Sequence, residues 1–299
     1  MSKKTYAVMG ATGHIGQVVV ELLLEKGHAV KALGRNEKKL AALQAKGAQI
    51  VKTAFDDSAA LTGAFKGVDG VFIMTPPSYE DESLSAAQDK AGEATIKALA
   101  DSGVKYAVNL SSVGAEQPSG TGPITGLYRQ EQRLAKLTGL HLVNLRPTSF
   151  MENSYFGIPV IKAYGINGAA FPGDYPMPTV ATKDIARKIV EFLDSLSFTG
   201  HQVFDFTGPK EYSMVEVTKA LGAAIGKPDL KYTQTPLDDI KKGMLGMGMK
   251  PEMVDLMIEM YSAGMAGKIH ATQEFTADHR GKTTIEEFAK TFASVFAQA

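Results

Sequence analysis

Short runs of apolar and β-branched residues alternate with stretches of helical periodicity in the first half of the chain. Six apolar runs predict strands, at residues 6–9, 29–33, 49–53, 70–74, 106–110 and 141–145. Between them lie three helical patterns that each end near a glycine suited to a left-handed cap, at residues 15–25, 86–102 and 128–138. This alternation is typical of βαβ units, so we predict an α/β fold with a doubly wound parallel sheet.

The pattern changes after Pro147. Glycine, proline and aromatic residues are dense between residues 155 and 178, which is typical of a connection that forms a pocket. Further along, the pattern predicts two strands and at least two helices: a helix around 184–193, a strand around 203–206, a helix around 215–224, a strand near 230–233, then helices to the end.

Methionines are concentrated late in the chain. Seven of the 13 lie between residues 244 and 265, and Met253, Met257 and Met260 share a helical face with Leu256. The stripe has two interpretations: ordinary core packing, or an apolar wall that adapts to differently shaped substrates because thioether side chains are flexible.

Composition excludes several classes of function. The chain carries 32 Lys and Arg against 32 Asp and Glu, and no basic run, so nucleic acid and anionic membrane surfaces are not expected partners. It has no cysteine, which removes disulfides and thiolate nucleophiles, and its six histidines show no metal-ligand spacing. No apolar run approaches the roughly 20 residues of a membrane-spanning helix. We expect a cytoplasmic protein without a metal site.

The sequence GATGHIG occupies residues 10–16, between the first predicted strand and the first predicted helix. A loop that runs from a strand into a helix N-terminus offers unpaired backbone N–H groups and the positive end of the helix dipole to a pyrophosphate. Glycine is needed where the backbone approaches phosphate and where helix and strand pack closely. In this βαβ context the motif predicts a Rossmann-type dinucleotide site.

The end of the second predicted strand reads LGRN. An enzyme that uses NAD usually places a carboxylate there for the ribose 2′-hydroxyl, but this chain has Gly34 and Arg35. A guanidinium can form paired hydrogen bonds with a 2′-phosphate, so NADP(H) is favoured over NAD(H). The alternatives are a solvated charge for Arg35 and an ordinary helix N-cap for Asn36.

These elements suggest a division of the chain into two parts. We expect an NAD(P)-binding Rossmann domain over residues 1–152, with residues 179–207 returning to it. Residues 153–299 would form a smaller, mostly helical substrate-binding region.

Several motifs, taken in order, resemble the NmrA-like group of atypical short-chain dehydrogenases. They are GATGHIG, LGRN, FDDSAAL, VFIMTPP, NLSSVGA, LRPTSFMEN, KDIARKIVEFL and FDFTGPKEYSMVEV, spread over about residues 5–235. Within the group the chain is most similar to bacterial NAD(P)H-dependent quinone, azo-dye and triphenylmethane reductases. The group also includes proteins that bind the dinucleotide and regulate without turnover.

The resemblance implies a set of cofactor contacts that follows the nucleotide from the pyrophosphate to the nicotinamide. Gly10, Thr12, Gly13, His14 and Ile15 would line the pyrophosphate, Arg35 and Asn36 the 2′-phosphate, Asp56 the adenine edge, Thr75 and Pro76 the adjoining ribose, and Ser111, Pro147 and Phe150 the nicotinamide. Each segment also has a structural explanation as a strand end, a loop start or, at Asp57 and Ser58, a helix N-cap.

The tyrosine and lysine of mainstream short-chain dehydrogenases are absent. Gln132, not lysine, stands four residues after Tyr128, and in our alignment Leu127 takes the place of the lysine. Val113 stands where a catalytic hydroxyl often follows the Ser-Ser pair. Nearby Glu131 is either a catalytic group or a solvated or cap-linked carboxylate.

An acceptor that delocalises the added electrons needs no strong proton donor, whereas an unactivated ketone does. We therefore expect an NAD(P)H-dependent oxidoreductase that transfers hydride directly to a quinone-like or other conjugated acceptor, a small apolar or aromatic molecule. Candidate pocket residues are Phe150, Asn153, Tyr155, Phe156 and Tyr175, followed by the methionine helix. The alternatives are a non-catalytic NADP(H)-binding sensor that acts through a protein partner and, less favoured, an epimerase.

Overall fold

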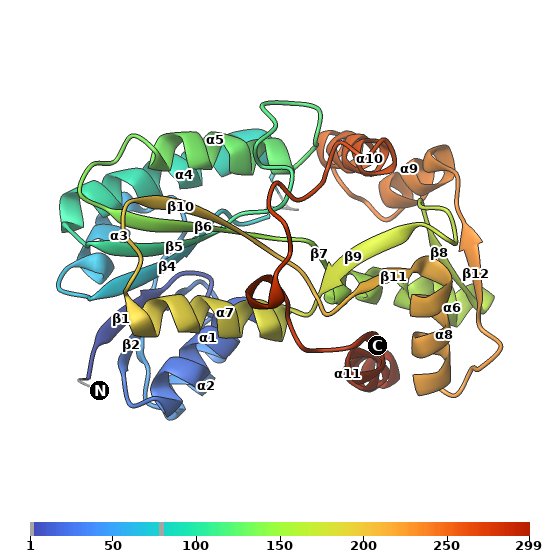
Figure 1. Ribbon diagram of the computed structural model, residues 1–299, viewed down its shortest axis with the longest axis horizontal. Helices are drawn as coiled ribbons and strands as arrows, with labels where there is room; N and C mark the ends of the chain where they lie inside the picture. Colours follow the sequence, from blue (N-terminus) through green and yellow to red (C-terminus); the bar gives the residue numbers. More distant parts are fainter. Residues whose placement is uncertain (1–2, 78–80) are drawn as a thin grey trace.

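Residues 3–77 and 81–299 are described by a computed structural model of the chain (Figure 1). Seven parallel strands form the central sheet in the order β10–β6–β5–β4–β1–β2–β3. Their bounds are β1 Thr5–Val8, β2 Ala29–Gly34, β3 Gln49–Lys52, β4 Gly70–Met74, β5 Tyr106–Leu110, β6 His141–Pro147 and β10 His201–Phe206. The predicted strands and the doubly wound Rossmann-type sheet are confirmed.

Helices cover both faces of this sheet. Alternate residues of β1, together with Met9 directly after it, take part in different cores: Tyr6 and Val8 pack in one hydrophobic cluster and Ala7 and Met9 in the other. The first cluster lies under α1 (His14–Glu25), α2 (Glu37–Ala45) and α7 (Thr182–Ser195), and the second under α3 (Ser58–Phe65), α4 (Leu84–Ser102) and α5 (Ile124–Leu134). The parallel strands are therefore buried on both sides, as their apolar composition requires.

Helix α5 begins and ends about four residues earlier than the predicted 128–138. Pro123 at its N-cap has a φ of −58°, already suited to a helix, whereas Gly126 weakens the helical pattern in the sequence. Packing explains this glycine, because a Cβ at position 126 would lie 1.9 Å from Gln88 Oε1 on α4. Tertiary contact, which the pattern does not reveal, fixes the start of this helix.

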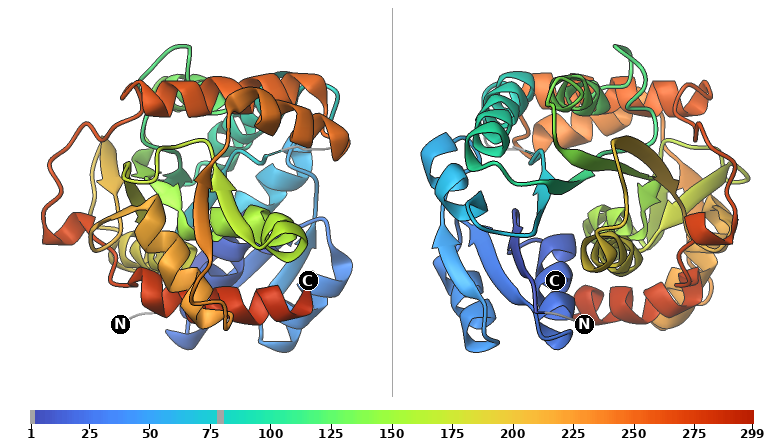
Figure 2. Two further views of the ribbon diagram at one scale, coloured as in Figure 1. Left: turned by 90° about the vertical axis from the view of Figure 1, so that its right-hand side faces the viewer. Right: turned by 60° about the vertical axis from the view of Figure 1, so that its left-hand side comes forward.

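The remaining elements form a smaller region beside the carboxyl ends of the strands (Figure 1). Two small sheets, β11–β9–β7 and β12–β8, are surrounded by helices. The bounds are β7 Ser149–Phe150, η1 Met151–Gly157, α6 Ile158–Tyr164, β8 Ile166–Ala169, β9 Pro176–Val180, β11 Glu211–Ser213, α8 Met214–Ala224, β12 Lys231–Gln234, α9 Leu237–Gly246, α10 Pro251–Met265, η2 Ala277–His279 and α11 Ile285–Gln298. Two further views place α9 and α10 on one side of the molecule and α11 on the opposite side (Figure 2).

The described residues contain neither a membrane-spanning helix nor a cluster of metal ligands. None of their helices combines the length and apolar character needed to cross a bilayer. Across residues 3–77 and 81–299, no three His, Asp or Glu side chains are grouped so that they could hold a metal ion.

Candidate cofactor and substrate site

The glycine loop after β1 is folded back tightly against its own helix. Gly10 adopts a φ of +62°, a left-handed conformation that glycine accepts without strain. Its carbonyl accepts a hydrogen bond from Gly13 N at 2.9 Å. A Cβ at position 16 would lie only 2.2 Å from the same carbonyl oxygen, so Gly16 is required for helix and loop to approach.

Helix α1 begins without a side-chain cap. Gly13 is its N-cap residue, and the first turn contains no acidic side chain. By contrast, the next three helices are capped by the side chains of Asn36, Asp57 and Ser83. The first-turn amides of α1, including that of Ile15, are therefore available to an anionic ligand at the positive end of the helix dipole.

The other expected cofactor residues follow the carboxyl ends of the neighbouring strands. Thr75 and Pro76 come directly after β4, Ser111 directly after β5, and Pro147 ends β6. The order of the strands reverses between β1 and β4. The carboxyl ends of these two strands therefore mark the point at which open α/β sheets bind ligands. Phe150 lies on β7, which connects this edge to the smaller region, and packs partly against the first hydrophobic cluster.

The expected adenosine contacts lie after β2 and β3. Arg35 is exposed, and its Cζ lies 6.0 Å from the centre of the Phe55 ring. Asp56 forms an ion pair with Lys90 Nζ at 2.6 Å, and this hydrogen bond is the main reason that the pKa of Asp56 is below its usual value. Asn36 accepts a hydrogen bond from Lys39 N at 3.0 Å, so it does serve as an ordinary helix cap. A contact of Asn36 with the 2′-phosphate stays a prediction.

Glu131 is neither solvated nor linked to a helix cap, the two ordinary explanations that the sequence suggested. It is 5% exposed and accepts hydrogen bonds from Arg146 Nε at 2.9 Å and Arg146 Nη2 at 2.5 Å. Ser111 Oγ donates to the same carboxylate at 2.5 Å. Burial is the largest single effect on the pKa of Arg146 and lowers it, but the hydrogen bonds with Glu131 and the charges of the nearby carboxylates together outweigh burial, so the pKa is raised.

Sequence reasoning did not single out Arg146. The available signal was a charged residue inside the apolar strand pattern HLVNLRP, since a buried arginine requires a carboxylate partner. The pattern could not identify that partner, because Glu131 lies on the preceding helix and its contact depends on how α5 packs on the sheet.

Tyr155 is an expected substrate residue whose ring lies near a residue of the glycine loop. Its ring centre lies 6.2 Å from that of His14, and the ring stacks on Phe292 of α11 at 6.0 Å with an interplanar angle of 17°. Burial, with a smaller effect from the charge of Glu152, raises the pKa of Tyr155. This tyrosine therefore joins the start of α1 to the aromatic core of the smaller region.

Besides Phe150 and Tyr155, three expected substrate residues lie in different surroundings. Asn153 is exposed and donates to Ser149 Oγ at 3.3 Å, and the side chain of Phe156 is 73% exposed. Tyr175 lies elsewhere: its hydroxyl donates to the carbonyl of Gly264 on α10 at 2.9 Å. The roles of these three residues in substrate binding stay predictions.

The methionine helix α10 lies against the loop that follows β5. A Cβ at Gly122 would approach the backbone oxygen of Leu256 to 2.0 Å, so the loop and the helix backbone are in direct contact. Met253 is buried, whereas Met257 and Met260 are only partly buried. Core packing accounts for Met253, and the two partly buried methionines remain available as an adaptable wall.

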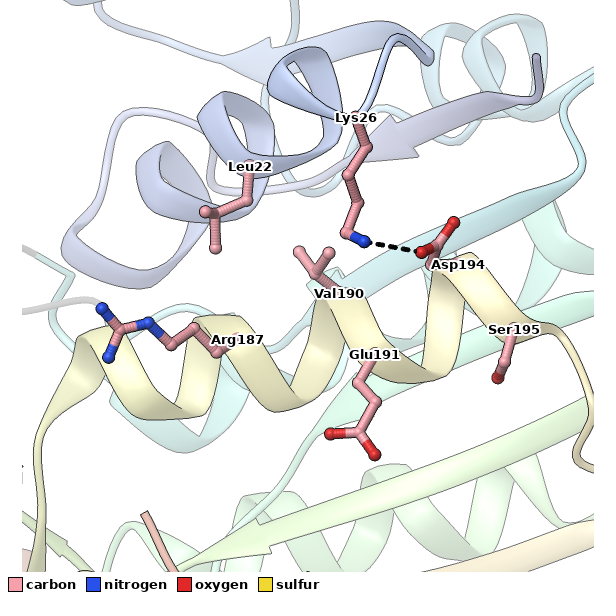
Figure 3. Close-up of a pocket in the computed structure, with 7 residues that line it drawn as sticks. All are labelled: Leu22, Lys26, Arg187, Val190, Glu191, Asp194 and Ser195. Carbon is pink, nitrogen blue, oxygen red and sulfur yellow. Dashed lines mark hydrogen bonds and ion pairs between the residues drawn. The ribbon is translucent and has the colours of Figure 1, made fainter. Parts of the chain in front are cut away.

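A surface pocket of about 420 Å³ lies between α1 and α7 (Figure 3). Its lining comes from these two helices alone and includes none of the expected cofactor or substrate residues: Leu22, Lys26, Arg187, Val190, Glu191, Asp194 and Ser195. An ion pair of 2.8 Å between Lys26 Nζ and Asp194 Oδ2 closes one end of it. This pocket is thus separate from the candidate site.

Comparison with known proteins agrees with the motifs. The model of the NmrA-like family matches residues 2–289. The chain is 32% identical over 298 residues to NAD(P)H azoreductase from Xenophilus azovorans, covering 98% of this chain and 99% of that protein. Its fold is similar to that of the NADPH-dependent quinone oxidoreductase of Escherichia coli, solved with NADPH, with a TM-score of 0.79, 22% identity and coverage of 96% and 99%.

A regulatory protein shares the fold as well. The structure of NmrA, a negative transcriptional regulator, in complex with NADP is similar at a TM-score of 0.73 and 18% identity, covering 99% of this chain and 97% of that one. At this identity the likeness concerns the fold alone. The match of the family model over nearly the whole chain confirms the resemblance found in the motifs, and the chain belongs to the NmrA-like family.

Proposed function

We propose that this protein is an NADPH-dependent reductase that transfers hydride directly to a quinone-like or other conjugated acceptor. One combination of features carries the proposal. Helix α1 begins after the glycine loop with no side-chain cap, and helix α5 lacks the tyrosine–lysine pair of a carbonyl reductase. The azoreductase relative, similar over its full length, supports a conjugated acceptor. We also propose a cytoplasmic location, which fits the cysteine-free composition.

The residues at the sheet edge fit the chemistry of NADPH. The first-turn amides of α1 would receive the pyrophosphate, and the exposed guanidinium of Arg35 would pair with the 2′-phosphate. Thr75, Pro76, Ser111, Pro147 and Phe150 would follow the ribose and the nicotinamide. When bound, this cofactor supplies the hydride. The protein then has to bind and orient the cofactor and the acceptor and to exclude water from the space between them.

Glu131, the carboxylate hydrogen-bonded to Ser111, is not expected to act as a proton donor. The Glu131 carboxylate is occupied by Arg146 and by the hydroxyl of Ser111. A quinone that accepts hydride becomes a phenolate-like anion, which delocalisation stabilises without immediate protonation. Positioning of a flat acceptor beside apolar and aromatic side chains is then the main contribution of the chain. Tyr155 and the partly buried methionines of α10 are candidates for that surface.

The test is NADPH oxidation by the purified protein with a panel of quinones, azo dyes and unactivated ketones, followed by the loss of NADPH absorbance. We expect saturable turnover with the conjugated acceptors and none with the ketones. Turnover of a simple ketone at a similar rate would contradict the proposed absence of a proton donor.

A second candidate is a sensor that binds NADP(H) and acts through a protein partner. It is favoured by the similar fold of the NmrA regulator in complex with NADP and by the same missing tyrosine and lysine. A calorimetric titration run beside the turnover assay separates the two. Tight NADPH binding without oxidation by any acceptor would favour the sensor.

A further inference from the structure

Three side chains from separate elements form a buried network at the carboxyl edge of the sheet. Ser111 follows β5, Glu131 lies on α5 and Arg146 lies on β6, and they are 3%, 5% and 6% exposed. Glu116 adds a longer contact, with Arg146 Nη1 at 3.4 Å from its Oε2. The network lies where the expected nicotinamide residues Ser111 and Pro147 meet.

The hydrogen atoms of this network can be assigned. Arg146 donates to both oxygens of Glu131, so both oxygens act as hydrogen-bond acceptors. The single hydroxyl hydrogen of Ser111 is therefore committed to Glu131 Oε1, 2.5 Å away. Charge-assisted hydrogen bonds of this kind are about twice as strong as neutral ones. Ser111 Oγ has only lone pairs left for a ligand.

We propose that Glu131, held by Arg146, is a positioning residue that fixes Ser111 Oγ as a hydrogen-bond acceptor for the carboxamide N–H of the nicotinamide. The proposal rests on the proposed function, which brings the nicotinamide to Ser111. It assigns the direction of the bond: the carboxamide N–H donates and the serine hydroxyl oxygen accepts. It also means that Ser111 supplies no proton to the substrate, although a serine at this place would otherwise be a natural candidate.

A role confined to packing does not account for the arrangement. The bidentate guanidinium already joins α5 to β6 through both oxygens of Glu131. That α5–β6 connection does not require Ser111, whose hydroxyl donates to the same carboxylate from the position after β5. The neighbouring Ser112 behaves as an ordinary loop serine, since its hydroxyl donates to the carbonyl of Val113 at 2.9 Å.

The test compares two ligands that differ in one donor. Calorimetry would measure the affinity of the protein for NADP⁺ and for its 3-acetylpyridine analogue, in which a methyl group replaces the carboxamide NH₂. We expect the wild-type protein to prefer NADP⁺ by about 3- to 10-fold, the effect of one hydrogen bond. Ser111→Ala should bind the two ligands within about twofold of each other. The matched control, Ser112→Ala, should keep the wild-type ratio.

Glu131→Gln tests the positioning step itself. The new amide can donate to Ser111, which releases the hydroxyl hydrogen and allows the serine to donate to the carbonyl present in both ligands. The preference for NADP⁺ should therefore fall, while 2′-phospho-ADP-ribose, which lacks the ring, should bind as tightly as to the wild-type protein.

An unchanged ratio in Ser111→Ala would overturn the proposal, and so would an unchanged ratio in a folded Glu131→Gln. If Glu131→Gln does not fold, the ratio in Ser111→Ala decides alone. These measurements need no turnover. Failure of the wild-type protein to oxidise NADPH would refute the proposed reductase, while the binding ratios would still decide how Ser111 is used.

Discussion

Replacing Gly16 with alanine should disrupt cofactor binding by moving the glycine loop. The added Cβ would lie 2.2 Å from the Gly10 oxygen, 2.7 Å from the Gly10 carbonyl carbon and 3.0 Å from Ala11 Cα. Ordinary contact begins near 3.4 Å, so the oxygen would have to retreat by about 1.2 Å. That oxygen accepts the hydrogen bond from Gly13 N, and the displacement would break it.

The magnitude follows from the overlap. Overpacking of this kind costs about 1 to 3 kcal/mol, which lowers the melting temperature of a chain of this size by roughly 2 to 5 °C. A loop displaced by about 1 Å no longer aims its amides at the pyrophosphate. Each hydrogen bond to a charged group contributes about 1.5 to 3 kcal/mol, so the loss of one should weaken NADPH binding at least about tenfold.

Gly63→Ala is the matched control. Gly63 lies inside α3, and a Cβ there would meet nothing within 4 Å. Alanine is favoured over glycine in a helix by up to about 1 kcal/mol, so this variant should melt at the same or a higher temperature and bind NADPH normally. Thermal unfolding and calorimetry of both variants are the measurements. Wild-type affinity in Gly16→Ala would refute the assignment of this loop to the cofactor.

Three other variants test separate features. Arg35→Ala should weaken NADPH far more than NADH in a binding titration, and equal effects would exclude a contact with the 2′-phosphate. Tyr128→Phe should leave turnover nearly unchanged, whereas a collapse in rate would show that its hydroxyl takes part in catalysis. Hydrogen bonds from Lys26 and His28 lower the pKa of Asp194 despite the opposing effect of burial. The pKa of Asp194 is thus lower in the folded protein than in the unfolded chain. Its stabilising effect is complete above the pKa of the unfolded chain, near 3.9, and is lost as the pH falls through the pKa of the folded protein. Asp194→Asn should cost up to about 1 kcal/mol at neutral pH in chemical denaturation, with the difference vanishing in acid, and a constant difference would contradict the linkage.

Local signals were enough to predict the sheet. The strands of the central sheet are continuous apolar runs because helices bury both faces. Such runs can be recognised in a single sequence. The glycine loop was equally visible, since the requirement at Gly16 arises from contacts only six residues away. Both the apolar strands and the glycine loop are recognised from residues that lie close together in the chain.

The interior of the site could not be predicted in the same way. The bond between Ser111 and Glu131 spans 20 residues, and the stacking of Tyr155 on Phe292 spans a still longer stretch. Neither contact produces a periodic pattern in the sequence, because each depends on how separate helices and strands pack together. The start of α5 was misplaced for the same reason, since Gly126 is explained by Gln88 of another helix.

The position of Tyr155 between His14 and α11 has a consequence for biosynthesis. The glycine loop is made early, but the aromatic side chains that support Tyr155 beside it are made only with α11. A nascent chain can therefore form its parallel sheet and expose the anion-binding helix end well before the aromatic side of the site exists. We therefore expect an unfinished chain that lacks α11 to lack the aromatic surface proposed for the acceptor, even where its glycine loop has already formed.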